Sequence, residues 1–366
     1  MEIPDVAFFL ANLGGGGAEK AMANLARDLQ SRSLKVEIVL GEAKGPNLAL
    51  IPDNVNLVDL RTRYVAKWLV ELTHYLRTRH PKVLISGLHH VNLVSIWAKA
   101  LSGANTKLVV TVHGPLSLEI GKSKKTLAKV IPLLVKMFYT RADKIVCVSS
   151  GIAKELVERY RLPEDKIEVI YNPVITSNIF VKAQEPVYHT WFEPGQPPVI
   201  LSAGRLTQAK DFETLIRAFA LVREKVHTRL MILGEGPDRP KLERLVESLQ
   251  LSECVCMPGF VDNPYKYMKR SAVFVLSSRW EGFGNVIVEA LALGIPVVST
   301  NCPSGPAEIL ANGKWGKLVP VGDPEALSLA ILEALNDDGS RGIERAMCFT
   351  AENIGTRYLE MIRPYL

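Results

Sequence analysis

Two glutamates eight residues apart, Glu281 and Glu289, are the residues whose type and spacing first suggest chemistry. They lie in the stretch LSSRWEGFGNVIVEALALG, where Glu281 follows a strand-like run and Glu289 lies in an apolar helical pattern. Carboxylates accept hydrogen bonds from hydroxyl groups, such as those of a ribose or a hexose. Since Val288 and Ala290 flank Glu289, a fully solvated position is not expected for it. The spacing therefore predicts contacts to two parts of one long polar ligand.

The turn between the two glutamates is predicted to offer backbone donors. Gly282 and Gly284 keep the loop slim, so that the amides of Phe283, Gly284 and Asn285 can approach a ligand. A helix that starts at this point adds partial positive charge. The turn is therefore expected to face an anionic or hydroxyl-rich group.

Two cations, Arg205 and Lys210, precede another predicted helix, which starts near Asp211 in the stretch SAGRLTQAKDFETLIRAF. Arginine can form a bidentate fork to phosphate oxygens, and lysine supplies a point charge. A pair of solvated surface cations is the alternative interpretation. Their place just after a predicted strand favours a diphosphate site.

A run of four glycines, Gly14 to Gly17, follows the first predicted strand and leads into a helix that opens at Ala18. Such a loop lets backbone amides approach an anion, although a tight turn also favours glycine. The stretch is not a Walker loop, because no Gly-Lys-Ser/Thr follows. It also departs from the dinucleotide fingerprint, because Glu19 stands where the third glycine belongs.

A histidine, His113, ends the predicted strand KLVVTVH and is followed by a glycine. Ligands of open parallel sheets bind outside the carboxyl ends of the strands, so His113 is a candidate for ligand contact. A hydrogen-bonded structural role is the alternative. His89 and His90 also follow a strand, but they open a helix, and for them the structural role is favoured.

Short apolar and β-branched runs alternate with helical patterns along most of the chain. Runs that are apolar throughout are typical of strands buried on both faces, and their alternation with helices predicts parallel sheets in an α/β fold. One predicted helix, AEKAMANLARDLQSR, has Ala18, Met22, Leu25, Ala26 and Leu29 on one face. The predicted strands are DVAFFLAN, KVEIVLG, VLISGL, KLVVTVH, KIVCVSS, IEVIYN, PVILSAGR, TRLMILGEG, VCMPGFV, AVFVLSS and PVVSTN, and GKLVPV is a last strand-like segment.

The alternation is interrupted once, by a proline-containing stretch without clear periodicity. A chain of 366 residues also exceeds one ordinary core. We therefore predict two tandem Rossmann-like domains, at 1–172 and 198–343, joined by a linker at 173–197. A helical stretch at 344–366 could cap the second domain or cross back to the first.

The charge is uneven: residues up to Asn172 include 24 Lys+Arg and 16 Asp+Glu, whereas the rest include 20 and 22. The excess predicts that the first half meets something anionic. No signal peptide or membrane-spanning run is evident, and the five cysteines form no Cys-x-x-Cys pair, so a reducing cytoplasm is expected. No nucleic-acid partner is expected.

A basic segment from 122 to 144 carries much of this excess charge. Its lysines fall on roughly one stripe of a helix, while Val130, Leu133, Leu134, Met137 and Phe138 are available for burial. Pro132 is expected to kink this helix or to start a new one. An interfacial helix on anionic lipid and an ordinary helix with solvated lysines both fit the pattern. The lysines of the stripe are Lys122, Lys125, Lys129 and Lys136.

The ordered set of these motifs resembles the retaining glycosyltransferases of family 4, which have the GT-B fold of two Rossmann-like domains facing across a cleft. The stretch EGFGNVIVE resembles the Glu-x7-Glu element of that family, and TNCPSGPAEIL looks like a bacterial subgroup that adds N-acetylhexosamines to sugars on polyprenyl diphosphate. The likeness covers nearly the whole chain. The other matching stretches, in the family's order, are GGGGAEK, TVHG, VIYNPV, GRLTQAKDFETLIRAF, MILGEGPDRPKL and SSRWEGFGNVIVEALALGIPVVST.

The resemblance implies roles for the residues of the second domain. Glu289 would bind the ribose hydroxyls of the nucleotide, and Glu281 would bind the transferred sugar. Arg205 and Lys210 would hold the diphosphate. The base would meet the backbone near Val261.

The resemblance also assigns residues in the first domain and shows two departures. Gly16 and Gly17 would approach the diphosphate across the cleft, and His113 would lie beside the sugar. Gly284 stands where proline is frequent, which should loosen the turn without removing its amides. Ala307 stands where the polyprenyl subgroup often has arginine.

The implied activity is retaining transfer from a nucleotide sugar, expected to be a UDP-sugar, to a glycan or a polyprenyl-diphosphate-linked saccharide at a membrane surface. The chain has no Asp-x-Asp, so neither a metal nor another cofactor is expected. A UDP-sugar epimerase or hydrolase of the same fold and a non-catalytic nucleotide-sugar-binding protein are the alternatives. A dinucleotide dehydrogenase is disfavoured by Glu19.

Overall fold

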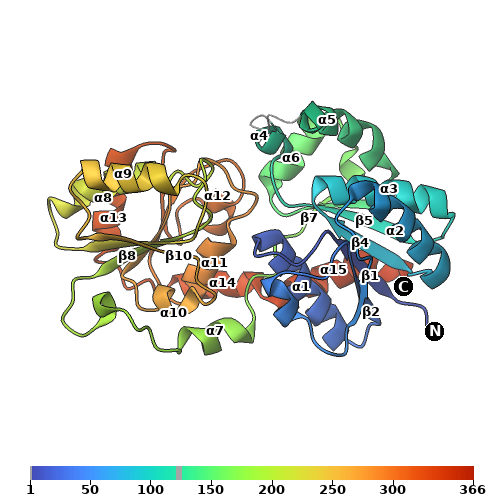
Figure 1. The fold of residues 1–366 in the computed structure, drawn as a ribbon, viewed down its shortest axis with the longest axis horizontal. Coiled ribbons are helices and arrows are strands. Elements are labelled where there is room, and N and C mark those ends of the chain that lie inside the picture. The colour runs from blue at the N-terminus through green and yellow to red at the C-terminus, as the bar shows by residue number, and fades with distance from the viewer. Residues whose placement is uncertain (1, 121–125) are drawn as a thin grey trace. The chain divides into compact units, whose positions relative to one another are not determined.

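The computed structural model describes residues 2–120 and 126–366 of the chain. The chain forms two compact units (Figure 1). The first unit comprises Met1–Val174 together with Thr350–Leu366, and the second comprises Ile175–Phe349. Each unit is described below by itself.

The first unit is built on a parallel sheet whose strand order is β3-β2-β1-β4-β5-β6-β7. Its central strands are fully buried because helices cover both faces (Figure 1). The order reverses between β1 and β4, where Val6 pairs with Val36 on one side and Val83 on the other. Such a reversal marks where ligands bind in doubly wound sheets. The strands are β1 Val6–Leu10, β2 Val36–Leu40, β3 Asn56–Asp59, β4 Val83–Gly87, β5 Lys107–Val112, β6 Lys144–Cys147 and β7 Ile167–Val169.

The helices of the first unit include one from the carboxyl-terminal end of the chain. Ile354 and Tyr358 of α15 belong to the same buried core as strands β1 and β2. Arg32 Nη2 at the end of α1 donates to the Glu352 carbonyl at 2.7 Å, which ties α15 to α1. The helices are α1 Gly17–Ser31, α2 Val65–Arg79, α3 His89–Ser102, α4 Leu116–Ile120, α5 Thr126–Phe138, α6 Ser150–Glu158 and α15 Ala351–Ile362.

The second unit has a parallel sheet in the order β10-β9-β8-β11-β12-β13. Here the reversal falls between β8 and β11, where Ile200 pairs with Val273. Its strands are β8 Val199–Ala203, β9 Arg229–Leu233, β10 Val255–Gly259, β11 Val273–Leu276, β12 Val297–Thr300 and β13 Lys317–Val319. Its helices are α7 Ser177–Ala183, α8 Phe212–Arg223, α9 Arg239–Ser248, α10 Tyr265–Met268, α11 Asn285–Ala292, α12 Pro306–Ile309, α13 Pro324–Ala334 and α14 Gly342–Ala346.

The predicted fold class, two α/β units with parallel sheets, is confirmed. Strand β3 escaped prediction because Asn56–Asp59 lies at the sheet edge and keeps polar, partly exposed residues. The stretch without periodicity contains helix α7, in which the Lys182 carbonyl accepts a hydrogen bond from Asn263 Nδ2. Helix α5 continues through Pro132 from Thr126 to Phe138, so no new helix starts there.

Within residues 2–120 and 126–366, no helix combines the length and the apolar character that a bilayer span requires.

Candidate functional site

The loops that follow β8 and β11 meet in an ion pair between Lys210 and Glu281. Lys210 Nζ lies 2.5 Å from Glu281 Oε1, and Ser278 Oγ donates to the same oxygen at 2.6 Å. The Glu281 side chain is 10% exposed and that of Lys210 is 23% exposed. Because water screens such a pair poorly, its charges interact more strongly than a surface pair would. The two residues that the sequence placed in separate motifs therefore form one cluster at the strand-order reversal of the second sheet.

The backbone around Lys210 is fixed by contacts from the β11 loop. Ser277 Oγ donates to the Lys210 carbonyl at 2.8 Å, and the Arg279 amide donates to the Ala209 carbonyl at 2.7 Å. Arg279 Nε also forms an ion pair with the buried carboxylate of Asp211 at 3.0 Å. Asp211 has a φ of +47°, a left-handed conformation that aspartate tolerates better than most residues. These contacts hold the cation at a fixed place next to Glu281.

The second predicted cation, Arg205, has a different environment. Its side chain is exposed, and it forms no ion pair with any described residue. The sequence pattern predicted a diphosphate contact for both Arg205 and Lys210. In the structure Lys210 is paired with Glu281, whereas Arg205 forms no ion pair with a described residue. Arg205 is therefore available to an anion without breaking an internal contact.

Glu289 lies inside α11 and is 4% exposed. Tyr265 Oη, from α10, donates to Glu289 Oε1 at 3.2 Å. A buried carboxylate that is hydrogen-bonded in this way is positioned rather than solvated. This agrees with the apolar neighbours of Glu289 in the sequence.

The turn before α11 differs from its expected form. Gly284 is the residue preceding the helix and has a φ of +101°. Proline, whose φ is fixed near −65°, does not reach this conformation. Glycine is therefore needed for the backbone conformation of this turn. The turn is not a loosened form of a turn that contains proline. Phe283 is buried and packs edge-on against Phe349, with ring centroids 5.5 Å apart, while Asn285 remains partly exposed.

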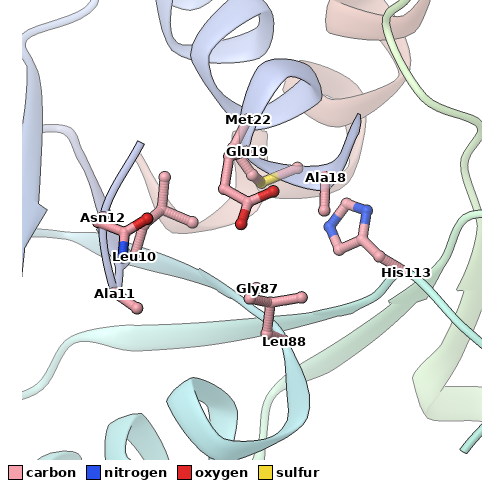
Figure 2. Close-up of a pocket in the computed structure, with 9 residues that line it drawn as sticks. All are labelled: Leu10, Ala11, Asn12, Ala18, Glu19, Met22, Gly87, Leu88 and His113. Atoms are coloured by element: carbon pink, nitrogen blue, oxygen red, sulfur yellow. The ribbon is translucent and has the colours of Figure 1, made fainter. Parts of the chain in front are cut away.

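In the first unit, a small pocket lies at the strand-order reversal between β1 and β4 (Figure 2). The Glu19 carboxylate and the His113 ring both line this pocket, beside Gly87 and Leu88 (Figure 2). His113 Nε2 lies 2.9 Å from Thr111 Oγ1. Burial lowers the pKa of His113 to about 4, so its ring is neutral at pH 7.

Glu19 lies close to the glycine loop, a contact that the sequence pattern did not predict. Gly16 precedes α1, and a Cβ atom there would lie 2.3 Å from Glu19 Oε2. The Glu19 carboxylate therefore lies beside the start of α1, where the partial positive charge of the helix favours an acidic side chain. A side chain at position 16 would displace that carboxylate. Gly17 begins the helix and is exposed.

Three further residues considered in the sequence are Val261, His89 and Ala307. Val261 lies in the partly exposed loop after β10. His89 is buried, with Nδ1 3.0 Å from the Tyr139 hydroxyl, and burial lowers its pKa to about 4. Ala307 lies in α12, directly after Pro306.

The lysine stripe lies mostly outside the described part of the chain. Lys122 and Lys125 are outside the described residues, as is the side chain of Lys129, whereas Lys136 is exposed on α5. Three of the apolar residues of this segment, Val130, Leu133 and Met137, are not buried within the first unit and are 44%, 57% and 55% exposed.

In the described residues no three His, Cys, Asp or Glu side chains come together as a metal site would require.

Two family models match the chain. The model described as Glycosyltransferase Family 4 matches residues 15–178, and the model described as Glycosyl transferases group 1 matches residues 189–348. Together they cover both units.

Among curated relatives, an enzyme of Campylobacter jejuni is 32% identical over 349 residues, covering 92% of this chain and 91% of the relative. It is named N-acetylgalactosamine-N,N'-diacetylbacillosaminyl-diphospho-undecaprenol 4-alpha-N-acetylgalactosaminyltransferase. The lipopolysaccharide core biosynthesis glycosyltransferase LpsE of Rhizobium meliloti is 33% identical over 232 residues, covering 62% of this chain and 65% of the relative.

Solved structures share the fold. HepE from Anabaena, in complex with UDP and glucose, has a TM-score of 0.83 and 19% identity, with 99% of this chain and all of that chain covered. The apo form of the lipopolysaccharide outer core galactosyltransferase WaaB has a TM-score of 0.74 and 23% identity, with 99% of each chain covered. These likenesses concern the fold alone, which consists of two parallel-sheet α/β units.

Proposed function

Because the chain belongs to glycosyltransferase family 4, we propose that it transfers a hexose or N-acetylhexosamine from a UDP-sugar, with retention of configuration, to a polyprenyl-diphosphate-linked saccharide. The observation that carries the donor part of this proposal is the cluster at the strand-order reversal of the second unit. There a free Arg205, a paired Lys210 and the carboxylate of Glu281 follow two adjacent strands. The epimerase, hydrolase and non-catalytic alternatives are addressed by the experiment below.

The donor is assigned to groups of the second unit by their chemistry. Glu289 accepts hydrogen bonds from the ribose hydroxyls, and its burial and its bond from Tyr265 support a fixed acceptor. Arg205 and Lys210 bind the diphosphate, and Glu281 binds the transferred sugar. The backbone at Val261 meets the base.

Backbone donors complete the donor site in this proposal. The amides of Phe283, Gly284 and Asn285 lie at the start of α11, where partial positive charge favours an anion. In the first unit, Gly16 and Gly17 at the start of α1 supply amides for the same diphosphate. His113, which is neutral, contacts the sugar by a hydrogen bond rather than by charge.

The chemical step needs stabilisation of a leaving group. As the bond from the anomeric carbon to the diphosphate breaks, negative charge grows on the diphosphate, and Arg205, Lys210 and the α11 amides are placed to stabilise it. Retention follows from attack on the same face as the departing phosphate, which takes the acceptor's proton. Neither an Asp-x-Asp motif nor a metal-ligating group of described residues supports a metal clamp.

The acceptor assignment is supported by the relative from Campylobacter jejuni, whose name specifies a diphospho-undecaprenol substrate. Such an acceptor lies at a membrane surface, and helix α5 offers a suitable contact. Its exposed Val130, Leu133 and Met137 lie three and four residues apart, on one face of the helix, and Lys136 adjoins them. Apolar side chains beside lysines are typical of interfacial helices on anionic lipid. We place the protein on the inner face of the cell membrane, in the cytoplasm.

The decisive experiment compares turnover of each UDP-sugar with and without an acceptor. A panel of UDP-sugars is incubated with the purified protein and a polyprenyl-diphosphate saccharide. The proposal requires UDP release that depends on the acceptor and yields an extended saccharide. Equal UDP release without acceptor would instead identify a hydrolase, and conversion of the donor to another UDP-sugar would identify an epimerase. Binding without any turnover would favour a non-catalytic role.

A further inference from the structure

A second cavity lies in the second unit, at the amino ends of β12 and β13 and thus at the opposite edge of the sheet from Lys210 and Glu281. Its volume is about 210 Å³. Leu291, Ile295 and Val297 form its apolar floor, and Trp315 contributes an indole to its wall. Nothing in the proposed transfer reaction uses this cavity.

Three glycines shape the walls of this cavity. A Cβ atom at Gly316 would lie 2.8 Å from the Val297 carbonyl oxygen, and one at Gly342 would lie 2.6 Å from Leu291 Cδ2. Gly339 has a φ of +67°, and a Cβ there would lie 2.5 Å from the Pro296 nitrogen. At each of these positions a side chain would collide with residues 291–297, so glycine allows the segments that line the cavity to pack closely against them.

Charged side chains surround the cavity. Lys314, Lys317, Arg341 and Asp337 all line it. Lys317 is paired with Glu333 at 2.8 Å. Lys314 and Arg341 have no salt bridge with any described residue. The cavity therefore has two cations available for a ligand and one carboxylate.

Trp315 and one of these cations, Lys314, are in contact. Lys314 Nζ lies 4.7 Å from the centroid of the Trp315 ring. A cation–π contact at an exposed site is weak compared with a charge-assisted hydrogen bond, so Lys314 can turn to an entering anion. The Asp337 carboxylate accepts from the Gly339 amide at 3.0 Å, which fixes its position on the rim.

A volume of about 210 Å³ suits a ligand of one ring. It exceeds the roughly 150 Å³ cavity that holds benzene. It lies below the range of about 300–1,000 Å³ that is usual for drug-sized ligands. A pyranose ring presents apolar C–H groups to an indole and hydroxyl groups to a carboxylate, while two cations select an acidic substituent.

We propose that this cavity is a second carbohydrate site, which binds a single pyranose carrying one acidic group, either a phosphate or a carboxylate. Trp315 contacts the ring, Asp337 accepts from its hydroxyls, and Lys314 with Arg341 binds the acidic group. The site is independent of the proposed donor and acceptor, and its occupancy is tested without measuring transfer.

The test uses the full chain and its tryptophan fluorescence, and the Trp315→Phe variant distinguishes the contribution of Trp315 from that of the other four tryptophans. Glucose 1-phosphate, glucuronate, glucose and inorganic phosphate are titrated separately into the wild-type protein. We expect a saturable change for one or both of the acidic sugars, with at least tenfold weaker binding of glucose and of inorganic phosphate. The two acidic sugars distinguish the phosphate from the carboxylate. Inorganic phosphate binding as tightly as the sugars would overturn the carbohydrate assignment.

Substitutions of the lining residues show whether the ligand binds in this cavity. Arg341→Gln and Lys314→Gln are each expected to weaken binding at least tenfold, whereas Lys225→Gln, an exposed lysine elsewhere in this unit, is expected to leave it unchanged. Trp315→Phe should abolish the fluorescence change while calorimetry still detects binding. Thermal unfolding of each variant verifies that it is folded. Unchanged affinity in both cation variants, or no saturable response at millimolar ligand, would overturn the proposal.

Discussion

Lys210 and Glu281, which are 71 positions apart in the chain, form a hydrogen-bonded ion pair beside the strand-order reversal of the second sheet. The pair means that the charge of Lys210 is already partly balanced before any ligand binds. An incoming diphosphate therefore shares Lys210 with Glu281, whereas it meets Arg205 without competition. This difference between the two cations leads to the first prediction.

Lys210→Ala is expected to lower both stability and turnover, whereas Arg205→Ala lowers turnover alone. Loss of Lys210 leaves the mostly buried Glu281 carboxylate with fewer partners, at a cost of about 1–3 kcal/mol in the free energy of unfolding. Arg205 is exposed and unpaired among the described residues, so its removal leaves stability within about 0.5 kcal/mol. Each should lower kcat by about 100-fold or more.

Urea unfolding and steady-state kinetics of the two variants measure these effects. The double variant Lys210→Ala/Glu281→Gln serves as the control, because it removes the unpaired charge. We expect it to be more stable than Lys210→Ala alone. Full kcat in both single variants would show that neither cation binds the leaving group.

Glu289→Ala is expected to weaken UDP binding because two ribose hydroxyls lose their acceptor. The expected loss is about 1–3 kcal/mol. Calorimetric titration with UDP measures it. Tyr265→Phe is the matched control, since it removes the hydrogen bond to Glu289 but keeps the carboxylate, and it should cause a smaller loss. Wild-type affinity in Glu289→Ala would remove this residue from the nucleotide site.

Stability is expected to fall as the pH drops from about 6.5 towards 4. Burial lowers the pKa of both His89 and His113 to about 4, below the ordinary value of 6.5. Between these values the unfolded chain binds more protons than the folded one, so acid favours unfolding. Each shift is worth at most about 3 kcal/mol.

Urea unfolding at a series of pH values tests this dependence. His89→Asn should flatten the slope between about pH 4 and 6.5, whereas the same change at exposed His74 should not. An unaltered slope in His89→Asn would mean that this buried ring does not cause the acid sensitivity.

The lysine stripe of the first unit is expected to bring the protein to anionic membranes. Each lysine near such a surface is worth about 1 kcal/mol. Changing Lys122, Lys125, Lys129 and Lys136 to glutamate should abolish co-sedimentation with anionic liposomes and slow transfer to a lipid-linked acceptor. UDP binding should persist. Salt at about 1 M should weaken wild-type adsorption, because the Debye length is then near 3 Å.

A charge-matched control distinguishes the effect of the lysine stripe from the effect of a lower net charge. It carries glutamate at four exposed basic positions of the second unit and should still bind liposomes. Equal adsorption of the stripe variant and the wild type would show that these lysines merely solvate a helix. The control positions are Lys225, Lys241, Arg244 and Lys269.

The fold was predictable because buried strands have a strong local signal. Strands such as Val6–Leu10 and Val199–Ala203 are mostly apolar and are buried along their whole length, since helices cover both faces of each sheet. Edge strand Asn56–Asp59 lacks that signal because it is short, has polar residues at both ends and is at least partly exposed throughout. The other three edge strands lie within predicted runs, so the local pattern missed a short, polar-ended strand rather than sheet edges in general.

The candidate site was predictable only as separate motifs. That Lys210 contacts Glu281 depends on β8 and β11 being neighbours, and sheet order is not encoded in either motif. Likewise, Glu19 looked like a defect in a dinucleotide fingerprint, but it approaches Gly16 at the start of α1. This approach depends on the side-chain conformation of Glu19, which the spacing of the motif does not specify.

Metal-independent transfer with retention can be measured from the anomeric configuration of the product and from its dependence on divalent ions. The purified protein is incubated with an α-linked UDP-sugar and a polyprenyl-diphosphate saccharide in the presence of EDTA, and the new glycosidic bond is examined by NMR. We predict an α-linked product, formed at the same rate with or without EDTA. A β-linked product, or no product until a divalent ion is restored, would contradict the account.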